Sequence, residues 1–224
     1  MNWAAVVLSV KLAFIVCAIL LVLGMPVAYW LATSRWRWKF FVEAVVALPL
    51  VLPPTVLGFY VLVAMGPRSP LGRAYTSWFG HGLAFTLEGL VLASVLYSLP
   101  FAVQPMAGAF AQVDRRLLDA SATLGASRRQ TFVRVVLPLS VSGVVTAAVL
   151  SFAHTLGEFG VVLMVGGNIP GLTRTVSIQI YDDVQALSYR SANQTALALL
   201  LFSFVVLSVV YALNRRPWTA WASR

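Results

Sequence analysis

The sequence predicts an all-α, polytopic membrane protein: a bundle of about five transmembrane helices with a short cytoplasmic helix. Of the 224 residues, 60% are hydrophobic and 10% are charged, against roughly 25% charged in an average soluble domain. The apolar residues gather in runs of about 20 or more, long enough to cross a hydrocarbon core of about 30 Å. The length allows five or six spans and no additional folded soluble domain. We therefore expect one transmembrane domain over residues 1–224.

The first span is expected over residues 4–32. This run is apolar apart from Lys11 and a few small residues, and it holds Cys17, the only cysteine, so no intramolecular disulfide is possible. No basic residue precedes the run and it is long for a signal-peptide core, so we expect it to be retained. The following residues 33–39 interleave three basic residues with two tryptophans, which is typical of the cytoplasmic membrane interface.

The second span, residues 41–65, is rich in proline. Proline removes a backbone donor and clashes with the preceding turn, so this helix must be kinked or broken. Irregular backbone at membrane depth is tolerated where it is buried in protein or lines a wet cavity, although a packing kink without substrate contact explains it equally well. The candidate residues for a translocation pathway in this span are Pro49, Pro53, Pro54, Thr55 and Gly58.

Three further apolar runs complete the expected bundle. The third span is bent near its end by Pro100 and Pro105. Two of the connections carry Gly and Pro turn signals, so we expect them to be loops. The three spans cover residues 84–106, 139–165 and 192–213, and the two loops cover residues 66–81 and 166–189.

The distribution of basic residues predicts the orientation. In a five-span arrangement eleven Lys and Arg share the side of residues 112–138 and four lie on the other side, and the richer side is cytoplasmic. The N-terminus is then outside and the C-terminus inside. The net charge of +9 reflects this bias and contact with anionic membrane lipid, so we expect no nucleic acid as a partner. The eleven are Arg35, Arg37, Lys39, Arg115, Arg116, Arg128, Arg129, Arg134, Arg215, Arg216 and Arg224, and the four are Arg68, Arg73, Arg174 and Arg190.

Residues 112–138 form a polar, basic segment between two apolar runs. Asp114 is suited to cap a first short helix, and Gly125 is suited to end it in the left-handed conformation. Ser127 and Gln130 have the spacing of a capping box that starts a second helix. Such a segment suits insertion into a groove on a partner protein, although an ordinary interfacial hairpin has the same composition.

The spacing in this segment resembles the docking loop of permease subunits in bacterial ABC importers. Those permeases carry Glu-Ala-Ala, three residues, Gly, nine residues, then Ile, any residue and Leu-Pro; the matching residues here are Asp119-Ala120-Ser121, Gly125, Val135 and Leu137-Pro138. Asp for Glu, Ser for Ala and Val for Ile are conservative departures. The resemblance implies that the segment couples the chain to an ATPase through Asp119, Ala120, Ser121, Leu124, Gly125, Arg128, Arg129, Leu137 and Pro138.

The resemblance extends over most of the chain. The proline-rich run 48–66 and the run HTLGEFGVVLMVGGNIPGLTRT, residues 154–175, are similar to the molybdate permeases of that superfamily. This similarity implies ATP-driven import of molybdate through a homodimer in the cytoplasmic (inner) membrane of a bacterium, with an ABC ATPase dimer and an extracytoplasmic substrate-binding protein as partners. It also implies no cofactor on this chain, because ATP and Mg²⁺ would bind the ATPase. Sulfate, thiosulfate or tungstate is the alternative cargo.

Two polar residues stand in the expected fourth span. His154 and Glu158 are four residues apart, but a metal site needs three or four ligands and the only other histidine is His81, so we expect no metal. Glu158 is a pathway candidate, yet it would repel an anion, so we expect it to pair with a basic residue or with backbone. The four outer arginines are better suited to meet an anion.

Two other classes of function, a membrane-embedded enzyme and a purely structural membrane protein, fit the sequence less well. A membrane-embedded enzyme is disfavoured because the chain carries no H-E-x-x-H, G-x-S-x-G or Walker A motif, so we expect no catalytic residues. A purely structural membrane protein would need neither a kinked span nor a docking loop. Both features favour a transport subunit.

Overall fold

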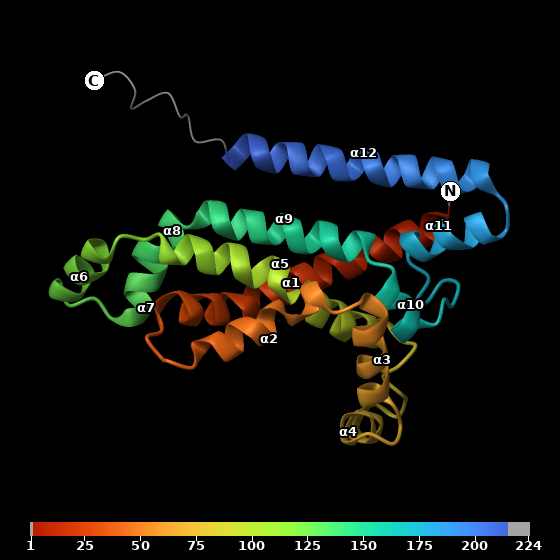
Figure 1. The fold of residues 1–224 in the computed structure, drawn as a ribbon, viewed down its shortest axis with the longest axis horizontal. Helices are drawn as coiled ribbons and strands as arrows, with labels where there is room; N and C mark the ends of the chain where they lie inside the picture. Colours follow the sequence, from red (N-terminus) through yellow and green to blue (C-terminus); the bar gives the residue numbers. More distant parts are fainter. Residues whose placement is uncertain (1, 215–224) are drawn as a thin grey trace.

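The structure is a computed structural model that describes residues 2–214. The expected cytoplasmic residues Arg215, Arg216 and Arg224 lie outside this range. The long helices α1 (Trp3–Thr33), α5 (Leu87–Ala111), α9 (Val141–Gly157) and α12 (Tyr189–Asn214) run side by side (Figure 1). The described part of the chain contains helices, turns and bends but no strand, so the expected all-α class is confirmed.

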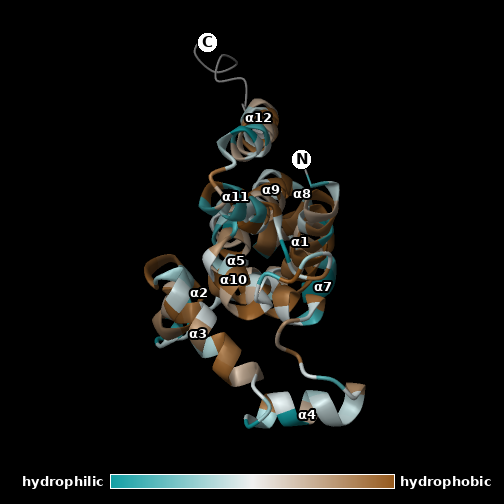
Figure 2. Ribbon diagram, turned by 90° about the vertical axis from the view of Figure 1, so that its right-hand side faces the viewer, coloured by the Kyte–Doolittle hydropathy of each residue, from teal (hydrophilic) through white to brown (hydrophobic). Residues whose placement is uncertain are grey.

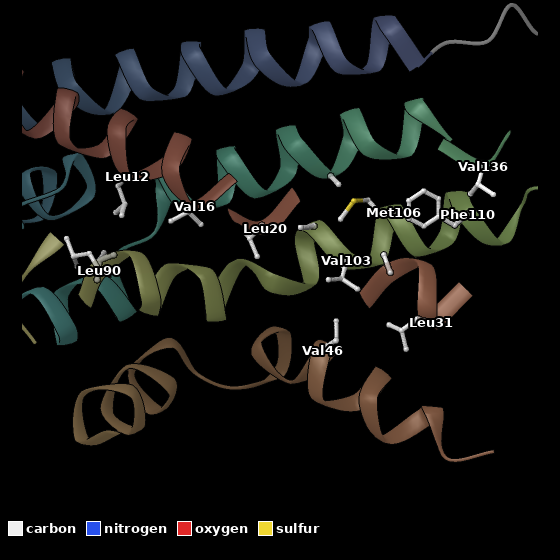
Figure 3. Packing of buried hydrophobic residues seen from close by; sticks show 14 of the residues in the cluster. Leu12, Val16, Leu20, Leu31, Val46, Leu90, Val103, Met106, Phe110 and Val136 are labelled. Atoms are coloured by element: carbon white, nitrogen blue, oxygen red, sulfur yellow. The ribbon is translucent and has the colours of Figure 1, made fainter. Parts of the chain in front are cut away.

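The centre of the bundle is the contact between α1 and α5. Leu12, Val16 and Leu20 of α1 and Val103 and Met106 of α5 are fully buried in one cluster, which Figure 3 shows from close by. Between membrane helices such contacts stabilise the bundle by close van der Waals packing, because lipid tails are as apolar as these side chains. Helices α1 and α5 approach each other closely at a glycine of α1. Helix α12 lies along the outside of the bundle, against α9 and α11 (Val176–Gln185).

Three helices, α1, α5 and α12, are each long and apolar enough to cross a membrane unaided. Two bent helix pairs, 39–65 and 128–157, raise the number of candidate spans among the described residues to five if each pair counts once. Figure 2 views the bundle end-on and shows hydrophilic residues on α7 (Arg128–Thr131) and on α11, whereas α1 is mainly hydrophobic. The chain is therefore a multi-pass membrane protein.

The expected second span is two helices, so the prediction that prolines kink or break it is confirmed. Helix α2 (Lys39–Val51) ends before Pro53, and α3 (Pro54–Met65) starts at Pro54, where a missing N–H costs nothing. The two axes differ by 112°. Figure 1 accordingly shows α3 running across the direction of the long helices.

The expectation of loops at residues 66–81 and 166–189 is wrong, because each holds a helix. Helix α4 (Pro70–Phe79) begins after Ser69, whose side chain accepts the N–H of Gly72, and ends at Gly80 with φ 76°. Helix α11 begins after Thr175, which caps it. Pro and Gly here act as start and stop signals of short helices rather than as turn residues.

The expected fourth span, 139–165, is also interrupted. Helix α9 ends at Gly157 and α10 (Gly160–Gly166) follows after two residues, Glu158 and Phe159. The prediction of a single continuous helix from this apolar run is therefore wrong. Glu158 explains the break, because its carboxylate binds the free backbone at the start of α10 instead of facing lipid.

Candidate coupling and translocation site

The polar segment folds as its capping residues predict. Asp114 Oδ1 accepts the N–H of Arg116 at 2.9 Å and starts α6 (Arg115–Thr123). Gly125 follows with φ 77°, in the left-handed region. Ser127 Oγ accepts the N–H of Gln130 at 3.3 Å, and Gln130 Oε1 accepts the N–H of Ser127 at 2.9 Å, which completes the capping box of α7. All three local predictions are confirmed.

A hydroxyl pair joins the two short helices. The Oγ of Ser121 on α6 and the Oγ1 of Thr131 at the end of α7 lie 2.8 Å apart, and Ser121 is only 9% exposed. Ser121 therefore contacts α7 through its hydroxyl, while it shares with Ala120 the lining of the groove beside α6. Its hydroxyl holds α6 at a set angle to α7.

The outer side of the segment is an open groove of about 540 Å³. Leu124, at its edge, is 87% exposed, and Leu117 is also exposed, so the groove presents apolar side chains on its surface. Among the other expected coupling residues, Asp119, Arg128, Arg129 and Pro138 are exposed and Leu137 is half-buried. The groove is lined by Leu117, Ala120, Ser121, Leu124, Gly125, Ala126, Gln130, Arg134 and Val135.

Aromatic rings connect this segment to the bundle. The helix continues from α7 as a π-helix, Phe132–Val136, before α8 (Leu137–Leu139). Such π-helical turns are rare and occur frequently at functional sites. The ring of Phe132 lies 4.8 Å from that of Tyr29 on α1 and 5.7 Å from that of Phe110 on α5. This cluster was not anticipated, because single aromatic residues near span ends are also typical of a membrane interface.

Helices α3 and α10 meet through glycine. A Cβ placed on Gly58 would lie 2.9 Å from Met164 Cβ, and one on Gly160 would lie 2.6 Å from Pro54 Cβ. Of the expected pathway residues, the structure thus brings Pro54 and Gly58 to the helix that follows Glu158. It leaves the others apart from this contact: Pro49 is buried in α2, and Pro53 and Thr55 are exposed.

Glu158 pairs with backbone, one of the two partners that we expected. It is 8% exposed, and its Oε1 accepts the N–H of Val161 at 2.7 Å. Within the described residues the ion pairs are Lys39–Glu43 and Arg174–Asp182, so no basic side chain neutralises Glu158 there. The carboxylate therefore stabilises the positive end of α10.

His154 does not share a helical face with Glu158, because α9 ends between them. Its Nδ1 lies 2.9 Å from Ser98 Oγ of α5, and its ring stacks on Phe101 at 3.9 Å. In residues 2–214 no group of three or more His, Cys, Asp or Glu is placed to hold a metal ion. His154 thus ties α9 to α5.

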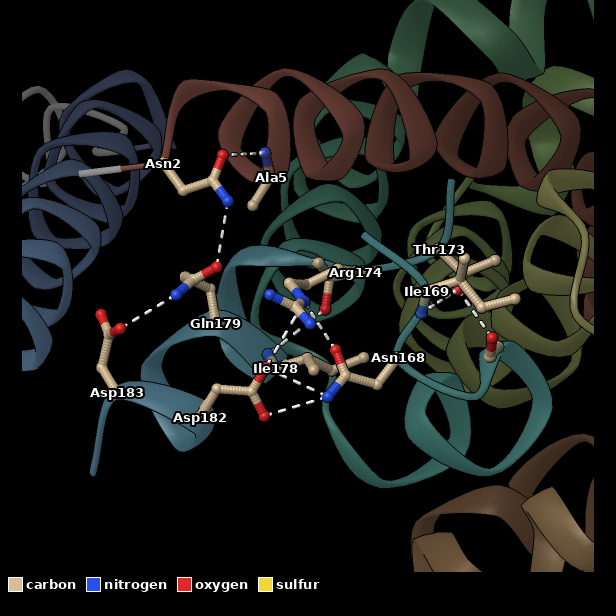
Figure 4. A network of polar contacts seen from close by, with 12 residues as sticks. Asn2, Ala5, Asn168, Ile169, Thr173, Arg174, Ile178, Gln179, Asp182 and Asp183 are labelled. Carbon is tan, nitrogen blue, oxygen red and sulfur yellow. Dashed lines mark hydrogen bonds and ion pairs between the residues drawn. The ribbon is translucent and has the colours of Figure 1, made fainter. Parts of the chain in front are cut away.

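Arg174, one of the four outer arginines, is already paired. Its Nε donates to Asn168 Oδ1 at 2.7 Å and lies 3.4 Å from Asp182 Oδ2. Asn168 Nδ2 in turn donates to both carboxylate oxygens of Asp182. Figure 4 shows the closed set of contacts. It fixes the turn after α10 against α11, and the charge of Arg174 is neutralised by Asp182.

A helical bundle with broken spans and a capped, grooved segment at one end defines a polytopic membrane protein. The model of the family described as binding-protein-dependent transport system inner membrane component matches residues 5–219, and the chain belongs to this family. It is 54% identical over 215 residues to the molybdenum transport system permease protein ModB of Azotobacter vinelandii, with 96% of this chain and 95% of that protein covered. It is 39% identical to ModB of Escherichia coli K12 over 184 residues, covering 82% and 80%.

Solved structures share the fold. A bacterial alginate ABC transporter in complex with a pentasaccharide-bound periplasmic protein matches with a TM-score of 0.75 and 17% identity, covering 95% of this chain and 78% of that chain. An inward-facing MetNI methionine ABC transporter matches with a TM-score of 0.69 and 18% identity, covering 94% and 95%. At this identity the likeness establishes the helical fold.

Proposed function

We propose that this chain is the permease subunit of an ATP-driven importer that carries molybdate across the cytoplasmic membrane of a bacterium. The observation that carries the proposal is the 54% identity, over nearly the whole chain, with a protein named as a molybdenum transport permease. Sulfate and molybdate are both tetrahedral dianions. The cargo is therefore assigned from the similarity to a molybdenum permease and not from a contact between this chain and an anion. Sulfate or thiosulfate is not favoured, and tungstate is the expected mimic.

The groove beside α6 is the proposed docking site of an ABC ATPase pair. Leu124 and Leu117 would enter a cleft on the ATPase, and exposed Arg128 and Arg129 would meet acidic groups on it or on lipid. ATP and Mg²⁺ would bind that partner and not this chain. An extracytoplasmic substrate-binding protein would deliver the anion to the opposite side of the membrane.

The segment would transmit ATPase closure to the spans in three steps. Displacement of α6 moves α7 through the hydroxyl pair Ser121–Thr131. Phe132 then pushes on α1 and α5 through its ring contacts. The start of α9 follows, because Ser140 Oγ donates to Ala109 O of α5 at 3.3 Å. Such packed contacts switch between discrete arrangements rather than deform continuously.

Two copies of the chain would form the pathway. The spans of one chain are few, and one of them consists of α2 and α3 at an angle of 112°, so they cannot readily surround a hydrated passage. Two symmetric copies of the chain can do so on their two-fold axis. We place the broken helices at this passage: α3, with Pro54 and Gly58, and the break at Glu158. Tight binding inside the membrane would slow release, so selection is left to the binding protein.

The deciding experiment is uptake into vesicles that contain this chain, its ATPase and its binding protein. Labelled molybdate should accumulate with ATP, and excess tungstate should compete while sulfate should not. Uptake of labelled sulfate that excess molybdate leaves unchanged would overturn the cargo and keep the transporter class. Transport without the ATPase would overturn the class itself.

A further inference from the structure

A second groove, separate from the one beside α6, runs along the outer seam between α1 and α5. Its volume is about 530 Å³. One end carries two charged side chains, Lys11 of α1 and Glu88 of α5, and the rest is lined by aliphatic side chains such as Ile15, Ile19 and Leu23. Lys11 is the one lysine inside the expected spans, and neither the transport cycle nor the core packing uses it.

The two charges lie at the same membrane depth. At 1.5 Å per residue, Lys11 is about 30 Å along α1 from Leu31, which neighbours the tryptophan-rich cytoplasmic interface. The same twenty residues lead from Glu88 to Gly108 near the cytoplasmic end of α5. About 30 Å is the thickness of the hydrocarbon core. Both side chains therefore reach the headgroup boundary of the outer leaflet.

The aliphatic part of the groove spans one leaflet. From Lys11 to Leu23 it extends about 18 Å along α1, close to half of the membrane thickness plus the interface. Its lining offers no hydrogen-bonding side chain below the charged end. An extended hydrocarbon chain fits such a trough, whereas a hydrated anion would lose its water there without compensation.

The charged end carries one cation and one anion. Both side chains are exposed, and neither takes part in the ion pairs found among residues 2–214, which are Lys39–Glu43 and Arg174–Asp182. Unpaired charges beside hydrocarbon are costly, so a ligand that supplies both opposite charges is favoured. A zwitterionic phospholipid does so: its phosphate meets Lys11, and its ammonium group meets Glu88.

We propose that this groove binds one zwitterionic phospholipid of the outer leaflet, with an acyl chain between α1 and α5. An anionic lipid would satisfy Lys11 and face repulsion from Glu88. The site is independent of the cargo that the transporter carries. Bound lipid would fill the seam between the two helices that form the centre of the bundle.

The test measures lipid retained by the complex of this chain with its ATPase. The complex is reconstituted in vesicles of equal phosphatidylethanolamine and phosphatidylglycerol, extracted in mild detergent, and its bound lipids are counted by native mass spectrometry. The wild type should retain about one phosphatidylethanolamine per chain. Lys11→Gln should lower this retention about tenfold, the effect of one charge-assisted hydrogen bond. Lys39→Gln, the same charge change at the cytoplasmic side, should leave it unchanged.

Two further variants make the result decisive. Glu88→Gln should retain lipid but shift the preference toward phosphatidylglycerol. Ile19→Trp should fill the groove and expel lipid without any charge change, whereas Val22→Trp, at a 70% exposed position outside the groove, should not. Retention at the wild-type level in both Lys11→Gln and Ile19→Trp would overturn the proposal. A disulfide between two copies carrying Ile15→Cys would also overturn it, because a span of the second copy would then cover the groove.

Discussion

The hydroxyl oxygens of Ser121 and Thr131 lie 2.8 Å apart and hold together α6 and α7, the two short helices of residues 112–138. Thr131→Val removes one hydroxyl at nearly constant volume and leaves the other buried without its partner, a loss of about 1–3 kcal/mol. We expect ATP hydrolysis to continue while uptake falls. Simultaneous assays of both activities in vesicles measure this uncoupling.

The matched control for that pair is Thr123→Val. The hydroxyl of Thr123 donates to Asp119 O within the exposed face of α6, so its loss should leave coupling intact. Adding Ser121→Ala to Thr131→Val should recover part of the uptake, because neither hydroxyl is then left alone. Additive losses in the double variant would show that the two hydroxyls do not act together.

Gly125→Val should abolish uptake while the protein still inserts. A Cβ at Gly125 would meet no atom within 4 Å, so crowding cannot be the cause; the cause is the φ of 77°, which a β-branched residue resists. Gly125→Asn should retain most uptake, since asparagine visits this conformation. Normal uptake by a well-expressed Gly125→Val complex would reduce the segment to a connector.

Gly160→Ala should impair transport more than Gly157→Ala. The two glycines flank the break at Glu158, but only at Gly160 would a new Cβ clash, 2.6 Å from Pro54 Cβ, while the space at Gly157 is open. Overpacking of this kind costs about 1–3 kcal/mol. Uptake rate and thermal unfolding of the detergent-solubilised complex report the difference. Equal behaviour of the two variants would contradict close packing of α3 on α10.

Phe132→Leu should lower uptake and leave ATPase docking intact. Leucine keeps an apolar side chain but loses the ring contacts with Tyr29 and Phe110, worth about 0.5–1.5 kcal/mol per pair beyond burial. Co-purification of the ATPase measures docking separately from transport. Phe59→Leu, at an exposed ring on α3, is the control for loss of an aromatic group.

The orientation predicts opposite labelling of two cysteines. In a Cys17→Ser background, a cysteine at Ser127 should react with an impermeant maleimide only from the cytoplasmic side, and one at Ser69 only from outside. Ser127 caps α7, and Ser69 caps α4, which follows the transverse helix α3 (Figure 1). The reverse pattern would invert the positive-inside assignment.

Local signals in the sequence were sufficient to predict the two short helices within residues 112–138. Asp114, Gly125 and the pair Ser127–Gln130 act on backbone only a few residues away, so their spacing alone predicts the two helices. The proline break at Pro53 is local in the same sense. Hydropathy likewise predicted the long helices, because each backbone in lipid must satisfy its own hydrogen bonds.

Contacts between distant residues were beyond prediction from the sequence. Phe132 meets Tyr29 across more than a hundred residues, and Ser121 turns inward because Thr131 is there to receive it. The break after Gly157 was missed since the run is uniformly apolar except for Glu158, whose backbone partner appears only once α10 exists. Helices α4 and α11 were missed because their capping residues are also common in turns.

The π-helical turn at Phe132–Val136 holds more residues than an α-helical turn. Rewinding it to α geometry would rotate everything on its N-terminal side by about 100° and advance it by about 1.5 Å for each residue released. The short helices α6 and α7 are thus joined to the membrane bundle through a helical turn whose winding can change. An axial displacement by a partner would then rotate the spans, while the backbone hydrogen bonds of this turn change from the π-helical to the α-helical pattern.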